Sequence, residues 1–158
     1  MNARYDPHYH VKVGDALSSL RTCSDPKDKT LIIGTGGAVH NLYRNNWAQM
    51  LRFRDNFGME TPPEATLMDF RQEFEDAITK NTGPALRRAI TQLMKLPNYR
   101  DAHATDDHFI PACFVAGAAG RPEDEGVKCV LGAEDWELVN MCNSQYTLGS
   151  WPVAAGGA

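Results

Sequence analysis

Apolar residues recur at helical spacing in four stretches of the chain. Positions 13, 16, 17 and 20 predict a helix from about Tyr9 to Cys23. Two more helices are expected over PEATLMDFRQEFEDAITKN, with apolar positions 67, 70, 74, 77 and 78, and over GPALRRAITQLMKLP, which has a proline in its first turn. The run FIPACFVAGAAG predicts a fourth helix, whose first turn can be capped by Thr105, Asp106 or Asp107.

Strand-like segments are short and few. TLIIG, residues 30–34, is an unbroken apolar run before a glycine cluster, which predicts a central strand buried on both faces. VKCVLG and NSQYTLGSW are the other strand candidates. We expect an α/β fold with a small mixed sheet flanked by helices. Because three strands hardly provide neighbours for both edges of a central strand, we also expect a homo-oligomer to complete or cover the sheet.

The remaining segments connect these elements. NLYRNNWAQMLRF is expected to be irregular or a short helix, with Trp47 and Phe53 as packing anchors, and DNFGMETPP a surface loop. A chain of 158 residues suits one domain, which we place at residues 1–150, followed by a flexible Gly-rich tail at 151–158. The charged residues of the predicted helices are expected on solvated faces: Arg71, Glu73, Glu75, Arg87 and Arg88.

Charge and cysteine content narrow the class of partner. The formal net charge is −4 and no basic stripe is present to neutralise a nucleic-acid backbone. No run approaches the roughly 18 apolar residues of a membrane helix, and the N-terminus lacks the apolar core of a secretory signal. The four cysteines (Cys23, Cys113, Cys129, Cys142) have no CxxC spacing, which favours reduced thiols. We therefore expect a cytoplasmic protein whose partner is a small molecule or another protein.

The glycine-rich stretch GTGGAVHN follows the predicted central strand directly. It does not match the dinucleotide-binding pattern GxGxxG, because Val39 stands where the third glycine is needed, and no Lys-Ser or Lys-Thr follows as in a phosphate-binding loop. The turn instead places His40 at the carboxyl end of a strand, where α/β proteins usually bind their ligands. A structural hydrogen-bonding role for His40 is the alternative.

Two further histidines, His103 and His108, stand in the stretch HATDDHFIP just before the small-residue helix. If they converge on His40, together with His8 or His10 from YDPHYHVKVG, four imidazoles would share one pocket. Imidazole is a common ligand of iron, zinc and copper, and its pKa of about 6.5 also suits proton transfer near neutral pH. The spacing HxxxxH differs from the HExxH of metalloproteases, so spacing alone does not indicate a metal site.

Three stretches in order resemble one family. LIIGTGGAVHNL at 31–42, AHATDDHFIPACFVAGAAG at 102–120 and YHVKVGDALSSLR at 9–21 are similar to segments of the class III extradiol ring-cleavage dioxygenases of the DOPA-dioxygenase type, which open catechols. The resemblance covers roughly residues 5 to 132. It implies Fe(II), or the Zn(II) that often replaces it, as the cofactor, and a small phenolic or other aromatic molecule as the substrate.

The resemblance also implies roles for particular histidines. His40 matches the family's acid–base histidine and His108 matches a metal ligand, whereas His103 and His10 match positions near the active site. The family's two other histidine ligands lie in an N-terminal portion, one of them in a Ser-His-Gly motif, which this sequence does not contain. The chain is therefore expected to be a truncated form in which His108, His40 and His10 are the candidate metal ligands and His40, His103 and His10 the candidate catalytic residues.

The resemblance, together with the ligands that this sequence lacks, implies three possible functions. The first is an extradiol-dioxygenase-like enzyme that acts on a phenolic or aromatic molecule through a histidine metal site and an acid–base histidine. The second is a metal-independent cyclase, isomerase or lyase of specialised metabolism, which uses the retained histidines for proton transfer. The third is an inactive fragment that serves as a binding domain.

Overall fold

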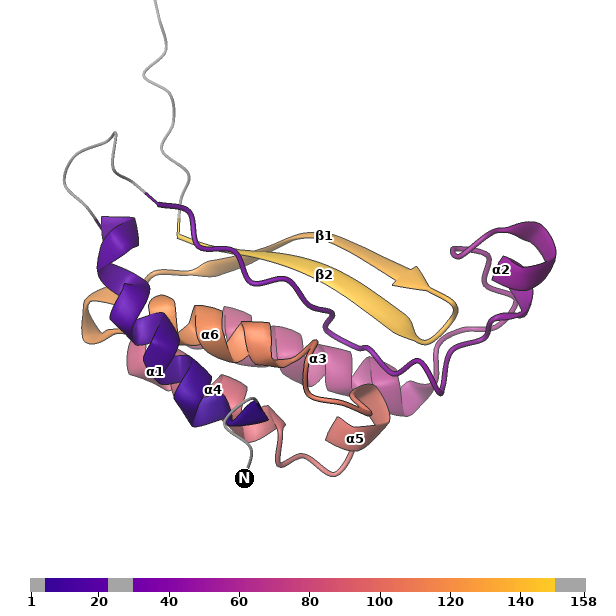
Figure 1. The fold of residues 1–158 in the computed structure, drawn as a ribbon, viewed down its shortest axis with the longest axis horizontal. Helices are drawn as coiled ribbons and strands as arrows, with labels where there is room; N and C mark the ends of the chain where they lie inside the picture. The colour runs from indigo at the N-terminus through magenta and orange to yellow at the C-terminus, as the bar shows by residue number, and fades with distance from the viewer. Residues whose placement is uncertain (1–4, 23–29, 150–158) are drawn as a thin grey trace, which may run out of the picture.

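The computed structural model describes residues 5–22 and 30–149. Helices lie on one side of a two-stranded hairpin, and one short helix lies apart at the far end (Figure 1). The helices are α1 (Pro7–Leu17), α2 (Ala48–Phe53), α3 (Ala65–Thr79), α4 (Gly83–Leu93), α5 (Tyr99–Ala102) and α6 (Ile110–Ala118). Two 3-10 helices, η2 (Ser18–Thr22) and η3 (Pro122–Asp124), and two strands, β1 (Cys129–Glu137) and β2 (Met141–Leu148), complete the described elements.

The four predicted helices are present as α1, α3, α4 and α6. On α1 and the adjoining η2 the apolar positions that predicted the helix are not buried, because Leu17 and Leu20 are exposed and Gly14 is the buried residue of α1. On α3 and α4 the apolar positions that the spacing aligns are buried. On α3 the buried residues are Leu67, Phe70, Phe74, Ala77 and Ile78. On α4, which starts with a proline in its first turn, Leu86, Ile90 and Leu93 are buried. These two helices pack on each other and supply about half of the buried core residues beneath the hairpin.

Glycines let α1 and α6 approach each other closely. A Cβ atom added to Gly14 would lie 1.9 Å from the Phe114 carbonyl oxygen, and one added to Gly117 would lie 2.1 Å from the Val11 oxygen. No real Cβ contact is that short, so both positions require glycine. This close packing fixes α6 against α1, and His108 lies just before α6 in the chain.

β1 and β2 pair antiparallel, from Cys129 opposite Leu148 to Glu137 opposite Met141. The turn between them is buried, and its residues Leu138 and Val139 have φ angles of 50° and 71°. Left-handed backbone is unfavourable for a β-branched residue such as valine. The surrounding segment holds the turn in place, because the Leu138 N–H donates to Asn56 and the Leu138 carbonyl accepts from Asn46.

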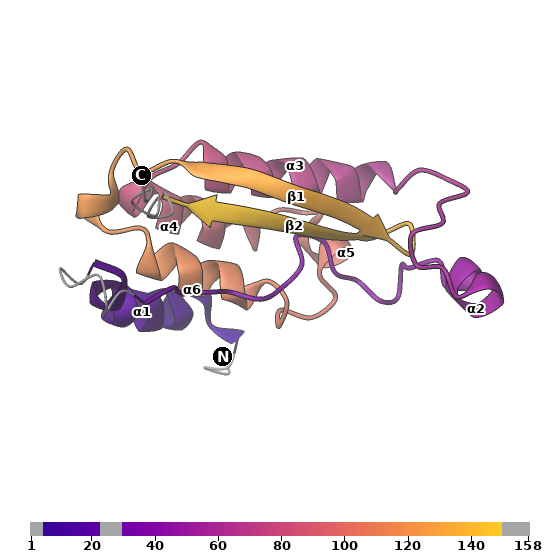
Figure 2. The same cartoon turned by 90° about the horizontal axis from the view of Figure 1, so that it is seen from above.

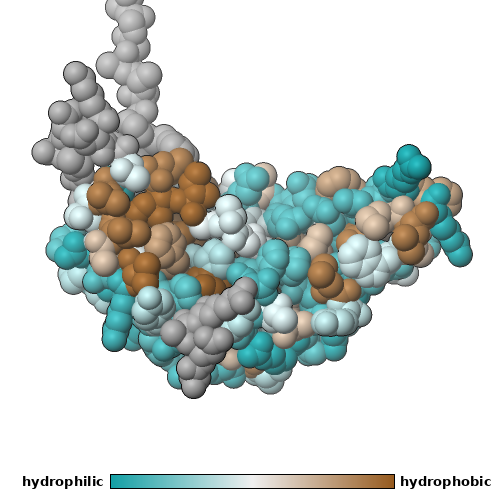
Figure 3. Space-filling view, viewed as in Figure 1, coloured by the Kyte–Doolittle hydropathy of each residue, from teal (hydrophilic) through white to brown (hydrophobic). Residues whose placement is uncertain are grey.

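The predicted buried central strand at residues 30–34 is wrong. The segment is extended and runs over α6 towards β2 (Figure 2), but it belongs to no strand. Leu31 and Ile33 are 58% and 67% exposed. Apolar side chains gather there on the surface, above α1 (Figure 3). The reason is that the described chain supplies helices on one face only, so the opposite face of this segment has no covering layer. The predicted homo-oligomer remains a prediction.

Several local expectations are also corrected. The residue that caps α6 is Phe109, and no side chain caps it, because the Asp106 carboxylate instead accepts hydrogen bonds from the Tyr99 hydroxyl and from Arg100. Trp47 and Phe53 are not packing anchors, since they are 36% and 67% exposed.

Two arginines expected on solvated faces make specific contacts instead. Arg71 pairs with Glu134 of β1, and Arg87 binds Asp15 and the Gly117 carbonyl. Among the described cysteines, Cys113, Cys129 and Cys142 are buried free thiols, as predicted. Cys23 and the predicted tail at 151–158 lie outside the described residues. None of the described helices is long and apolar enough to cross a membrane.

Candidate functional site

Backbone hydrogen bonds to two other segments fix the chain at Val39 and His40. Val39 exchanges both backbone hydrogen bonds with Cys142 of β2, at 3.2 and 3.0 Å, and the His40 N–H donates to the Ala102 carbonyl at 2.9 Å. His40 and His103 therefore form a parallel bridge between two segments 63 positions apart. The sequence predicted His40 at the carboxyl end of a strand. His40 does lie at the carboxyl end of the 30–40 segment, but that segment is not a strand.

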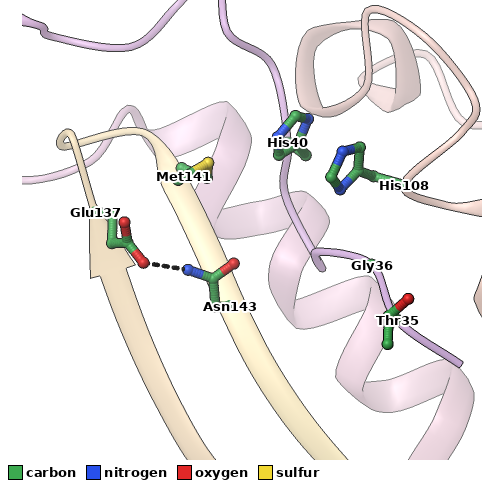
Figure 4. Close-up of a pocket in the computed structure, with 7 residues that line it drawn as sticks. All are labelled: Thr35, Gly36, His40, His108, Glu137, Met141 and Asn143. Atoms are coloured by element: carbon green, nitrogen blue, oxygen red, sulfur yellow. Dashed lines mark hydrogen bonds between the residues drawn. The ribbon is translucent and has the colours of Figure 1, made fainter. Parts of the chain in front are cut away.

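The imidazoles of His40 and His108 stack on each other. Their ring centroids are 3.4 Å apart and their planes differ by 8° (Figure 4). Gly36 makes this approach feasible, because a Cβ atom there would lie 2.1 Å from the His108 carbonyl oxygen. The glycine cluster that fails as a nucleotide motif thus serves to bring the two histidines together.

The two histidines line a pocket of about 330 Å³, which is the lower end of the range for small-molecule sites. The His108 side chain is 39% exposed, so solvent reaches the site. Across from the histidines lies the tip of the hairpin, where Glu137 accepts a hydrogen bond from Asn143 at 2.7 Å (Figure 4). The pocket is lined by Thr35, Gly36, His40, His108, Glu137, Met141 and Asn143.

Burial and neighbouring charge act on the pocket histidines. Partial burial, followed by the proximity of His108, lowers the pKa of His40 against the opposing effect of Asp107. The Asp107 carboxylate accepts a hydrogen bond from the Thr105 hydroxyl, which lowers the pKa of that carboxyl. It also lies 3.8 Å from Nε2 of His108. His40 is therefore neutral near pH 7 and available to accept a proton.

His103 is fully buried behind the pocket rather than in it. Its Nε2 donates to the Ala38 carbonyl at 3.0 Å, and its Nδ1 has no hydrogen-bond partner among the described residues. The rings of Phe70, Tyr99 and Phe109 surround it at 5.4 to 5.5 Å. Burial lowers the pKa of His103 to about 4, so it is neutral and holds the segment before His40 in place.

His10 lies on α1, with its ring edge-on to Tyr9 at 5.5 Å, and it does not line the pocket. His8 is an exposed residue at the start of the same helix. The structure therefore brings His40 and His108 together, places His103 behind them, and leaves His10 apart.

Sequence reasoning missed Glu137, Met141 and Asn143, because it ended the first strand at Gly132 and did not predict the hairpin tip.

The described pocket does not hold the ligand set that Fe(II) or Zn(II) requires. Protein sites for these metals usually take three side-chain ligands, and no group of three histidine, cysteine or acidic residues in the described ranges is placed to hold an ion. The lone pairs of two stacked rings also lie in nearly parallel planes, here 3.4 Å apart between ring centroids, so they do not converge on one ion. The described residues do not by themselves fit the metal, and the set His108, His40 and His10 is not assembled.

No family model matches the chain. Among solved structures it is similar to an uncharacterized protein, JW3007, from Escherichia coli K12, with a TM-score of 0.67 and 18% sequence identity over 92% of this chain. The chain spans about half of that protein, 52% of its length. At this identity the similarity shows a shared fold alone.

Proposed function

We propose that the chain binds a small phenolic or other aromatic molecule in the pocket and catalyses proton transfer at His40. The observation that carries this proposal is the stack of two imidazoles that open onto a pocket of small-molecule size. A planar ring can lie along the stacked pair, and its hydroxyl can reach a ring nitrogen. The proposed substrate class, a phenolic or other aromatic molecule, comes from the resemblance of the sequence to the extradiol dioxygenases.

The proposed chemistry needs only the residues present. Neutral His40 accepts the proton of the phenol O–H, and the resulting phenolate carries the electron pair. Return of that proton to another atom of the substrate gives an isomerisation or ring closure, or assists a leaving group in an elimination. His40 itself returns the proton, and the Asp107 carboxylate, which acts against burial to raise the pKa of His40, favours the protonated ring in between. His103 acts as a positioning residue through Ala38.

The test uses phenols and catechols as probes, with chelator present and oxygen excluded. We expect a bound probe to shift the NMR signals of His40. We expect the turnover rate to fall by roughly a hundredfold or more in the His40→Gln variant. The exposed Lys95→Gln variant is the control for handling and folding. A folded protein that binds none of these probes would contradict the proposal, and binding without turnover would favour the inactive binding domain.

A second candidate is the ring-cleavage dioxygenase itself. His40, His108 and Glu137 all line the pocket, and two histidines with one carboxylate is the ligand composition of many non-haem Fe(II) oxygenases. In the structure Glu137 is held by Asn56 and Asn143, away from the histidines. This function predicts near-stoichiometric bound metal, and catechol-dependent O₂ uptake that chelator and His108→Ala both abolish. Turnover that persists in chelator without oxygen would exclude it.

A further inference from the structure

Asn143 lies on the wall of the pocket across from the two histidines, and it has no role in the proton transfer at His40. It stands on β2, two residues after Met141, which pairs with Glu137 of β1. Glu137 and Asn143 are therefore diagonal neighbours on one face of the hairpin, close enough for their side chains to meet. Both side chains line the pocket together with His40 and His108 (Figure 4).

The carboxylate of Glu137 is occupied by two asparagine side chains. Its Oε1 accepts a hydrogen bond from Nδ2 of Asn143 at 2.7 Å, and its Oε2 accepts one from Nδ2 of Asn56 at 3.3 Å. Asn56 belongs to the segment that also holds the hairpin turn, through the bond from the Leu138 N–H to its carbonyl. Each oxygen of Glu137 thus has a donor from the protein, which gives the carboxylate a positioning role.

The hydrogen bond to Glu137 fixes which way the amide of Asn143 points. A carboxylate only accepts hydrogen bonds, so the NH₂ group of Asn143 faces Glu137 and the amide oxygen faces away. Figure 4 shows this oxygen turned from Glu137 towards the open space beside the histidines. Within the described part of the chain no side chain donates to it, and the pocket lining includes no lysine or arginine. A hydrogen-bond acceptor therefore stands open across from His40 and His108.

We propose that Asn143 determines which aromatic molecules the pocket accepts. Its amide oxygen accepts a hydrogen bond from a second donor on the ring, while His40 takes the proton of the first hydroxyl. Glu137 is the positioning residue that keeps this oxygen turned to the ligand. The inference rests on the proposed function and narrows its substrate class to phenols with a further hydroxyl or amino group. A ring without that donor leaves the acceptor unpaired when bound, and a site built to form a hydrogen bond discriminates against such a ligand.

Binding of paired probes to the full chain tests the inference, with oxygen excluded and chelator present. Each pair consists of a dihydroxybenzene and the fluorophenol in which fluorine replaces the second hydroxyl, in the ortho, meta and para patterns. Fluorine is close to a hydroxyl in size but donates no hydrogen bond. We expect the wild-type chain to bind the dihydroxy member of at least one pair roughly tenfold more tightly, as measured by NMR titration.

Three variants assign that preference to its residue. Asn143→Leu keeps the size of the side chain but removes the acceptor, so the preference should be lost while both probes still shift the His40 signals. Glu137→Gln should reduce the preference in part, because a glutamine donates as well as accepts and leaves the Asn143 amide free to turn. Gln145→Leu is the matched control and should keep the preference, since Gln145 lies on the same face of β2 but is exposed and outside the pocket.

The outcomes separate this inference from the proposed function. Equal binding of both members in all three pairs would overturn the inference and leave the proposed function standing. A preference that persists in Asn143→Leu would assign the second donor to another acceptor and overturn it as well. Failure of every phenol to bind would overturn the proposed function together with the inference. Far-UV circular dichroism checks folding, and Glu137→Gln carries the test by itself should the leucine variant be unfolded.

Discussion

Histidines and large apolar residues are buried on one side of the described chain and exposed to solvent on the other. On the closed side, beneath the hairpin, His103 and the aromatic rings around it are fully buried. On the open side His108 is solvent-accessible and Leu31 and Ile33 are on the surface. His103 and His108 are only five positions apart. Their surroundings, rather than their residue type, make one a structural donor and the other a candidate for chemistry.

The largest expected effect comes from the closed side. Phe70→Ala should lower the free energy of unfolding by about 4 kcal/mol, because the removed ring leaves a cavity among Tyr99, His103 and Phe109. Met68→Ala on the same helix is the control, since Met68 is 48% exposed and should cost far less. Urea unfolding of both variants checks this, and equal losses would mean that α3 is not buried as described.

A second prediction concerns the contact of α1 with α6. Gly117→Ala should destabilise the chain by about 3 kcal/mol, because the new methyl group overlaps the Val11 carbonyl oxygen and the backbone must move. The matched variant Gly132→Ala meets nothing closer than 3.7 Å and should change stability little. Thermal unfolding distinguishes the two, and a harmless Gly117→Ala would show that the helices are further apart.

The third prediction is a pH dependence of stability that arises from His103. Its pKa is about 4 in the folded chain and about 6.5 when unfolded, so the unfolded chain takes up the proton more readily. The stability is fully present above about pH 6.5, and about 3 kcal/mol is lost as the pH falls to 4.

His103→Gln is the matched variant for this effect, because its amide can still donate to the Ala38 carbonyl but does not titrate in this range. Urea unfolding of both proteins between pH 7 and pH 4 should show the steeper loss in the wild type. Identical pH slopes would mean that His103 is not held neutral in the interior.

The smallest expected effect lies on the open side. His108→Gln should raise the pKa of His40, because it removes the neighbouring imidazole that helps to lower it, but the pKa should stay below its ordinary value, since burial is the larger cause. NMR titration of the histidine ring protons measures this shift. An unchanged pKa of His40 would show that the two rings do not stack in solution.

The helices were predictable because their hydrogen bonds are internal and their apolar spacing depends only on nearby residues. The positions 67, 70, 74, 77 and 78 named from the sequence are the ones that α3 buries. The hairpin strands were found only in part, and the tip that completes the pocket was missed, because strand pairing links residues that the sequence does not show as neighbours. The prediction of a buried strand at 30–34 failed for the same reason, since burial on two faces needs layers supplied by other segments.

For the candidate site, the sequence by itself determined which residue types are available: a glycine cluster before His40, and His103 and His108 before a small-residue helix. Only the tertiary structure decided how they are used. Gly36 against the His108 carbonyl brings two imidazoles into a stack, while the aromatic core encloses the third. The physical reason is that protonation and access depend on burial and on neighbouring charges, which arise from contacts between segments distant in the chain.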